Sequence, residues 1–146
     1  MATTTASNYA APATATSPQD TLALIGRILI AYLFIPAGIN KLLGFAGTVG
    51  YIASVGLPLP QLGAVIAIIV ELGFGIALLL GYKTRWTAFV MALFVLATAL
   101  FFHNFWGMPE AKYAMMKLNF DKNMAIAGGL LAFSVLGAGR FSIDKR

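Results

Sequence analysis

The chain contains no cysteine and a single histidine, His103, among its 146 residues. The lack of cysteine excludes disulfide bonds, thiolate metal sites, iron–sulfur clusters and dithiol redox chemistry within this chain. A single histidine excludes haem ligation by two histidines of the same chain. One histidine and one carboxylate inside an apolar run are also too few ligands for a metal site. We recognise no haem, flavin, iron–sulfur or metal site, so electrons for any redox reaction must come from outside the chain.

Charged residues are also scarce, at 10% of the chain, whereas 60% of the residues are hydrophobic. This composition is far more apolar than that of a soluble domain and indicates an integral membrane protein. The formal net charge is +5. Because the cations stand mostly near the ends of apolar runs, where they anchor and orient helices, we attribute this charge to the membrane and expect no nucleic-acid partner.

The beginning of the chain differs in composition from the rest. Residues 1–19 are rich in Ala, Thr, Ser and Pro and carry no charge, which predicts a disordered N-terminal tail. This tail lacks the basic start and apolar core of a secretory signal peptide, so we expect it to be retained. The stretch Ser17-Pro18-Gln19-Asp20 is typical of a helix start. We therefore predict one transmembrane domain over residues 20–146.

Four apolar runs are long enough to cross a bilayer core, which takes about 20 residues. We predict spans at about residues 22–43, 61–81, 86–105 and 119–139. Residues 44–60 are broken by Gly and Pro, and we expect a short interfacial helix there that covers the mouth of the bundle. Residues 107–121 are polar and are predicted to be a connection with partial helix at the membrane surface. The predicted fold is all-α, an integral membrane four-helix bundle with a short interfacial helix between spans 1 and 2.

A carboxylate stands in the middle of the second span. Glu71 would face lipid at a cost of several kcal/mol unless it is paired, protonated or next to water. Helical spacing puts it on a stripe of small residues, which lets a neighbouring helix approach closely. This stripe comprises Ala64, Ala67, Glu71 and Gly75. We therefore expect Glu71 to point into the bundle.

The first span carries two cations on one helical face. The members of this face are Arg27, Ala31, Phe34, Gly38 and Lys41. With a rise of about 1.5 Å per residue, Arg27 lies roughly 7 Å and Glu71 about 15 Å inside the same membrane boundary, whereas Lys41 lies about 12 Å from Glu71 in depth. We therefore expect Arg27 to be the partner of Glu71 in a buried pair, which can also be purely structural. The alternative is that both cations only extend to opposite headgroup layers.

The third and fourth spans add polar residues to the predicted interior. His103 ends a stripe formed with Ala88, Ala92 and Ala99, although a histidine bonded to a loop carbonyl at the interface is an equally good interpretation. Asn123 begins a stripe that continues through Ala127, Leu130, Ser134 and Gly137.

The cations that flank the four spans predict the orientation of the chain. One side of the membrane holds Lys83, Arg85, Arg140, Lys145 and Arg146, and the other holds Lys41, Lys112, Lys117 and Lys122. Because the side with more cations is usually cytoplasmic, we predict that both termini are cytoplasmic. Four predicted site residues then lie near the outer face: Asn40, Lys41, His103 and Asn123.

Several motifs occur together in this order: Arg27, Gly38-Ile39-Asn40-Lys41-Leu42, Gly56-Leu57-Pro58-Leu59-Pro60, Glu71-Leu72-Gly73-Phe74-Gly75, Leu80-Gly81 and His103. With them the chain resembles, over about residues 20–143, the DoxX family of small four-helix bacterial membrane proteins. The resemblance implies a bundle in the bacterial inner membrane and an association with redox complexes. Members are described as oxidoreductase components, and a relative is the membrane subunit of a thiosulfate to quinone oxidoreductase. It also implies that Arg27, Lys41, Glu71 and His103 match recurrent polar positions.

These observations leave three functions open. The first is a quinone-linked oxidoreductase component, with quinone as ligand, Glu71 and His103 as catalytic residues, and a redox partner or soluble reductant as electron donor. Its substrate-binding residues would be Arg27, Asn40, Lys41 and Asn123. The second is a non-catalytic membrane assembly or ligand-binding module with a structural polar cluster. The third is a small transporter or proton-coupled channel, which would require a homo-oligomer surrounded by membrane lipid.

Overall fold

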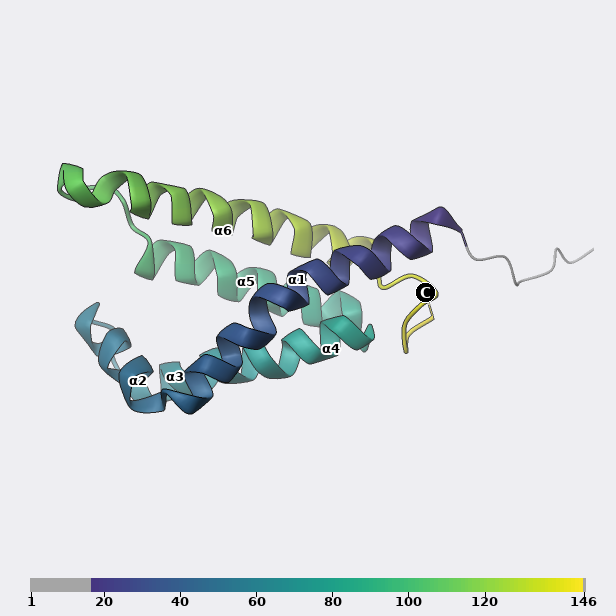
Figure 1. The fold of residues 1–146 in the computed structure, drawn as a ribbon, viewed down its shortest axis with the longest axis horizontal. Coiled ribbons are helices and arrows are strands. Elements are labelled where there is room, and N and C mark those ends of the chain that lie inside the picture. The colour runs from purple at the N-terminus through teal and green to yellow at the C-terminus, as the bar shows by residue number, and fades with distance from the viewer. Residues whose placement is uncertain (1–16, 146) are drawn as a thin grey trace, which may run out of the picture.

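The computed structural model describes residues 17–145, so most of the predicted tail at residues 1–19 lies outside the described residues. All regular structure in the described part is helical (Figure 1). The elements in chain order are α1 (Pro18–Leu43), α2 (Phe45–Ser54), α3 (Pro60–Ile68), the π-helix η1 (Ile69–Phe74), α4 (Gly75–Leu80), α5 (Thr84–Phe102) and α6 (Glu110–Leu136). The prediction of an all-α fold is confirmed.

Three helical runs in the described residues are long and apolar enough to cross a membrane. They are Pro18–Leu43, Pro60–Leu80 and Thr84–Phe102, which agree closely with the first three predicted spans. The second run combines α3, η1 and α4 without interruption. α6 is also long, but the charged residues of its first half lower its hydropathy. The helices run back and forth, with α6 beside α5 (Figure 1).

Local signals in the sequence mark the ends of these helices, and the predicted helix start at Ser17-Pro18-Gln19-Asp20 is confirmed. The carboxylate of Asp20 accepts hydrogen bonds from the backbone N–H (2.9 Å) and hydroxyl (3.0 Å) of Ser17 at the start of α1. Pro60 is the first residue of α3. Gly81, at a φ of +68°, ends α4 in the left-handed conformation that glycine adopts without strain.

The fourth run differs from the prediction. A continuous helix begins at Glu110, well before residue 119, so residues 110–121 are part of α6 and not a separate connection with partial helix. Lys117 and Asp121 form an i,i+4 pair at 2.7 Å on this first half, which supports the helix there. The rings of Phe105 and Phe120 also pack edge to face, with centroids 5.3 Å apart, and join the loop before α6 to the helix.

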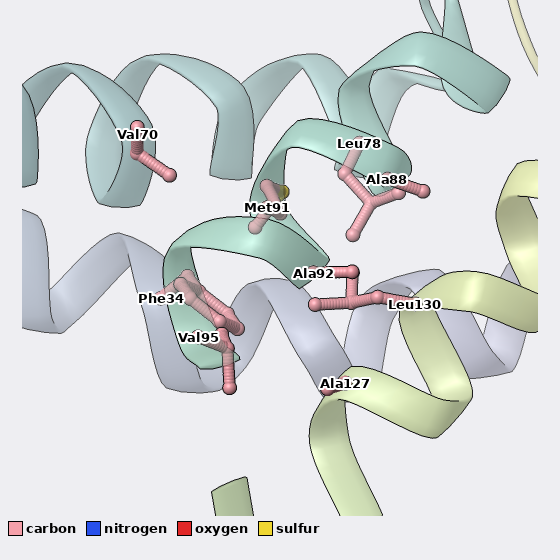
Figure 2. Packing of buried hydrophobic residues seen from close by; sticks show 9 residues of the cluster. All are labelled: Phe34, Val70, Leu78, Ala88, Met91, Ala92, Val95, Ala127 and Leu130. Atoms are coloured by element: carbon pink, nitrogen blue, oxygen red, sulfur yellow. The ribbon is translucent and has the colours of Figure 1, made fainter. Parts of the chain in front are cut away.

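The helices meet in a core that consists largely of small side chains. The predicted inward faces of α1 and of the second run are buried, including Arg27 and Glu71, and only Lys41 at the end of the α1 face is partly exposed. The central cluster draws residues from α1, η1, α4, α5 and α6 (Figure 2), namely Phe34, Val70, Leu78, Ala88, Met91, Ala92, Val95, Ala127 and Leu130. Alanine on α5 and α6 lets the backbones approach closely, as in other membrane helices.

A short helix follows α1, as predicted. α2 packs against α3 and α1 near the end of the molecule at which α5 ends and α6 begins (Figure 1). The ring of Tyr51 on α2 stacks on that of Phe102 on α5, with centroids 5.5 Å apart. α2 therefore helps to enclose the space between the first two runs and α5. Its location in the membrane interface stays a prediction.

Candidate functional site, an apolar cavity with a buried ion pair

A cavity of about 470 Å³ lies between α1, α2, the α3 to η1 run, α5 and α6. Its walls are mainly apolar and include several aromatic rings. The polar side chains that line it belong to Lys41, Thr48, Tyr51, Glu71, Thr98, His103 and Asn123. The structure thus brings together four of the six predicted site residues in one cavity.

The ion pair in this cavity joins α1 to η1. Lys41 Nζ lies 2.6 Å from Glu71 Oε2, and the two side chains are 32% and 11% exposed. The prediction that Arg27 is the partner of Glu71 is therefore wrong. Because Glu71 is surrounded by apolar groups, a charged partner within hydrogen-bond distance offsets much of the cost of burying its charge.

The direction of the side chains and the register of the helices explain this partner. The prediction assumed that residues 22 and 81 lie at the same depth in the membrane. The close contacts show a different register, in which Gly38 lies against Leu72 and Phe34 against Gly75. Glu71 is therefore nearly level with Gly38, about one helical turn before Lys41. Helical side chains point toward the N-terminus of their own helix, so Lys41 extends toward Glu71, whereas Arg27 extends away from it.

A close approach of these two helices lies beside the ion pair. A Cβ atom on Gly38 would lie 2.6 Å from the backbone nitrogen of Leu72, so only glycine fits there. Leu72 and Glu71 both belong to η1, the π-helical turn within the second run. π-helical turns are rare in proteins, and those that occur often lie at functional sites. The sequence carries no recognised signal for this turn.

His103 closes the cavity where α5 ends. Its backbone N–H donates to the carbonyl of Ala99 at 3.2 Å. Its Nδ1 atom is buried and, among the described residues, has no hydrogen-bond partner. Burial and the nearby charge of Lys122 lower the pKa of His103, and both favour the neutral form of its ring. A buried nitrogen without a partner is costly, and a ligand in the cavity can supply that partner.

The two predicted asparagines have different positions. Asn123 on α6 donates through Nδ2 to Thr98 Oγ1 on α5 at 3.2 Å, and both residues line the cavity. Asn40 is exposed and does not line it. Its role in substrate binding stays a prediction without support from its position. Thr98 was not among the predicted site residues, although threonine within an apolar span is a sequence signal for a polar contact.

Arg27 lies at the opposite end of the helices and is fully buried. Its guanidinium donates to the carbonyl oxygens of Leu78 (3.4 Å) and Leu79 (2.6 Å), at the end of α4, and of Phe141. The last carbonyls of a helix have no hydrogen-bond donor within the helix, and here the guanidinium of Arg27 provides donors for them. The structure places Arg27 outside the cavity, where it joins α1 to α4 and to the segment after α6.

We call this end of the molecule, opposite the cavity, the base. The segment after α6 (residues 137–145) completes it. The backbone N–H of Ile143 donates to Leu80 and that of Asp144 to Gly81, both at 3.0 Å. The carboxylate of Asp144 accepts from the N–H groups of Lys83 (2.9 Å) and Thr84 (2.8 Å), at the start of α5. The base is therefore closed by backbone hydrogen bonds, in contrast to the cavity end.

Long apolar helices with a buried ion pair beside an apolar cavity define an integral membrane protein of the helical class. The DoxX family profile matches residues 22–104, more than half of the chain. The chain belongs to the DoxX family, which confirms the resemblance seen in its motifs.

Three relatives illustrate the range of similarity. The chain is 40% identical over 128 residues to the inner membrane protein YphA and 41% identical over 127 residues to the inner membrane protein YqjF, both of Escherichia coli. These matches cover 88% and 87% of this chain and 91% and 92% of the relatives. It is also 28% identical over 125 residues to the ER-derived vesicles protein ERV29 of Saccharomyces cerevisiae, covering 86% of this chain and 33% of that protein. No solved structure matches the chain.

Proposed function

We propose that this protein binds the head group of a membrane quinone in the cavity beside Glu71 and is the membrane component of a quinone-linked oxidoreductase. The observation that carries the proposal is the Lys41–Glu71 pair in the wall of a mainly apolar cavity. A quinone has two carbonyl oxygens on its ring and an apolar tail, so its site needs a few polar groups within an apolar slot. A volume of about 470 Å³ lies in the usual range for small-molecule sites.

We infer that the ligand enters from the lipid phase. The residues that line the cavity include large apolar side chains that are about half exposed. Leu33 on α1 is 50% exposed, Ile66 on α3 46% and Phe101 on α5 53%. In a membrane such side chains contact acyl chains, so a lipid-soluble molecule reaches the cavity without crossing water.

The polar residues of the cavity have separate roles in this proposal. Lys41 has three N–H donors and directs one to Glu71, so it can also donate to a ring oxygen. The free Nδ1 of His103 is a second contact for the head group. Glu71 takes up or releases the proton that accompanies the reaction. The bound quinone would supply the redox chemistry itself.

The electrons come from a partner in this proposal. The chain has no cysteine and one histidine, so a redox partner protein or a soluble reductant must deliver them. The chain thus serves as the membrane part of an assembly, and its own residues bind and orient the ring and move protons.

We further propose a four-span bundle in the bacterial inner membrane, with α6 as the fourth span and both termini cytoplasmic. The N–H of Arg140, after α6, donates to Asp20 Oδ1, near the start of α1, at 2.8 Å. Two ends that meet on one side require an even number of crossings, which supports α6 as a span. The names of the two E. coli relatives support the location, and the excess of cations at this end supports the orientation.

Gentle extraction followed by quinone analysis tests the proposed function. Full-length protein purified in mild detergent should retain quinone or quinol, detected by extraction and mass spectrometry. Glu71→Gln, Lys41→Met and His103→Ala should each lower the retained amount at least about tenfold, which corresponds to the loss of about one good hydrogen bond. Glu110→Gln and Lys112→Met remove the same kinds of charge at the same end but outside the cavity, and should retain the wild-type amount. Folded wild-type protein without quinone would contradict the proposal.

A second candidate is a structural or assembly module, favoured by the fact that Lys41 and Glu71 satisfy each other without a ligand. In that case Lys41→Met alone and Glu71→Leu alone each destabilise the protein, and the double variant Lys41→Met/Glu71→Leu restores its stability. Quinone retention would then be absent in all variants, whereas the quinone proposal requires it in the wild-type protein.

A further inference from the structure

A second cavity, of about 370 Å³, lies at the base of the molecule, near the turn between α4 and α5. It is lined by Lys83, Arg85, Trp86, Gly137 and Asp144. It therefore combines two cations, an aromatic ring and one carboxylate, and shares no residue with the cavity around Glu71.

The carboxylate in this cavity is already engaged. Both oxygens of Asp144 accept backbone N–H groups at the start of α5, where a negative charge stabilises the helix. Among the described residues, neither Lys83 nor Arg85 forms a salt bridge. The ammonium of Lys83 lies over the ring of Tyr82, 5.6 Å from its centroid. The side chains of both cations are therefore available to an anion from outside the chain.

The charges of the whole molecule favour an anion at this end. The described part of the base holds five cations and two carboxylates: Arg27, Lys83, Arg85, Arg140 and Lys145, with Asp20 and Asp144. The rest of the molecule holds four cations and three carboxylates: Lys41, Lys112, Lys117 and Lys122, with Glu71, Glu110 and Asp121. An anionic group is thus attracted more strongly to the base.

The surroundings of the cavity match a lipid at the edge of a membrane. Trp86 is 72% exposed and Tyr82 is 48% exposed, as expected for rings at the level of the headgroups. Below Trp86, Phe89 and Leu93 follow on the same face of α5 and are 40% and 51% exposed. On α6, Leu136 next to the cavity is 75% exposed. Acyl chains can therefore lie on apolar surface while the headgroup occupies the cavity.

We propose that this cavity binds the headgroup of an anionic phospholipid. Lys83 and Arg85 contact the phosphate, and Trp86 packs against the glycerol region of the lipid. Basic pockets of this kind, beside spans and on the cytoplasmic side, suit anionic lipid headgroups. A bound lipid holds the α4 to α5 turn and the segment after α6 together, because both line the cavity. This inference does not depend on the quinone proposal.

Native mass spectrometry of the full-length protein with defined lipids tests this inference. Delipidated protein is titrated with phosphatidylglycerol or phosphatidylcholine in detergent. Wild-type protein should bind one phosphatidylglycerol at least about tenfold more tightly than phosphatidylcholine. The variant Lys83→Gln/Arg85→Gln should lose most of this preference. The matched control Lys112→Gln/Lys122→Gln, with the same loss of charge at the opposite end, should keep it.

Three outcomes of this lipid titration would overturn the inference: equal affinity for both lipids in the wild-type protein, an unchanged preference in Lys83→Gln/Arg85→Gln, or an equal loss in the control. Because Lys83 has a positive φ of 45°, the single change Arg85→Gln on α5 is measured as well and should lower the affinity without affecting folding. Inorganic phosphate should not displace the lipid at millimolar concentration. Displacement by phosphate, or capture of an acidic peptide in place of the lipid, would show that the site is not a phospholipid site.

Discussion

The two cations of α1 lie on the same helical face, but their surroundings differ. Arg27, at the base, is fully buried and donates to three backbone carbonyls. Lys41, at the other end, is partly exposed to a cavity and pairs with one carboxylate. The first cation belongs to a closed network and the second borders an open space.

This difference distinguishes a structural role for Arg27 from the binding role that we propose for Lys41. Arg27 donates to the backbone carbonyls of Leu78, Leu79 and Phe141, so the loss of the guanidinium removes three hydrogen bonds that hold the base together. The Lys41–Glu71 pair keeps free donors and a cavity beside it, so a ligand can share it. A buried ionisable residue in a membrane helix is thus not by itself evidence for a binding site, and the groups that it contacts decide its role.

The largest effect should follow from Arg27→Ala. The change removes the three hydrogen bonds from Arg27 to the carbonyls of Leu78, Leu79 and Phe141, so we expect a loss of about 3 kcal/mol or more in the free energy of unfolding. Accumulation of folded protein should fall, and the unfolding temperature of any purified protein should drop. Circular dichroism during heating in detergent measures this loss.

Lys41, at the cavity end of α1, provides the control for the Arg27→Ala variant. Lys41→Ala removes a cation from the same helical face and should cost much less, because Glu71 borders a cavity and can take up a proton. Arg27→Lys retains the charge without the planar donor fork and should fall in between. If Lys41→Ala were the more destabilising change, the roles assigned to the two cations would be reversed.

A smaller effect is expected from Gly38→Ala. The added methyl group would lie 2.6 Å from the backbone nitrogen of Leu72, so α1 must move away from η1. Overpacking of this kind costs about 1–3 kcal/mol. The movement also separates Lys41 from Glu71, so the ligand in the cavity should bind more weakly. Thermal unfolding and ligand retention, measured on the same preparation, check both effects.

Gly73→Ala is the matched control for Gly38→Ala. Gly73 lies in the same π-helical turn, and a Cβ atom there would have no neighbour within 4 Å. We expect unchanged or slightly higher stability, because alanine favours helix over glycine by about 1 kcal/mol. Equal losses in both variants would indicate that η1 tolerates no side chain in general and would remove the special role of Gly38.

The sequence predicted which faces of the helices point inward. The stripes around Arg27 and Glu71 are buried because small residues at steps of three and four leave a helix one face for close packing. The start of α1 directly after Ser17 followed from capping and proline chemistry. These features are local, so a single sequence is enough to predict them.

The partner of Glu71 could not be predicted in the same way. It depends on the register between α1 and the second run, which the close approach of Gly38 to Leu72 determines. It also depends on the π-helical turn, which shifts the residues after it relative to a regular helix. Both result from packing between segments distant in sequence. The burial of Arg27 and Glu71 was therefore predictable, but not their partners.

The smallest effect concerns His103, whose pKa is lowered by burial and by the charge of Lys122. In the unfolded chain a histidine titrates near pH 6.5. Between pH 6.5 and the lower pKa of the folded state, the ring is protonated in the unfolded chain but still neutral in the folded protein. The unfolded chain therefore binds more protons in this pH range, and the stability of the fold decreases as the pH falls through it. The loss should begin near pH 6.5 and reach its full size below the pKa of the folded state.

This prediction can be measured on a single signal, since the chain has one histidine. Nitrogen-15 NMR of histidine-labelled protein should give a midpoint below 6.5, and Lys122→Gln should raise it by removing one of the two causes. His103→Gln should abolish the corresponding loss of stability between neutral and mildly acidic pH. A midpoint at or above 6.5 would mean that His103 is solvated or paired with a carboxylate. Its Nδ1 would then have a partner already, and His103 would belong to the closed part of the molecule together with Arg27.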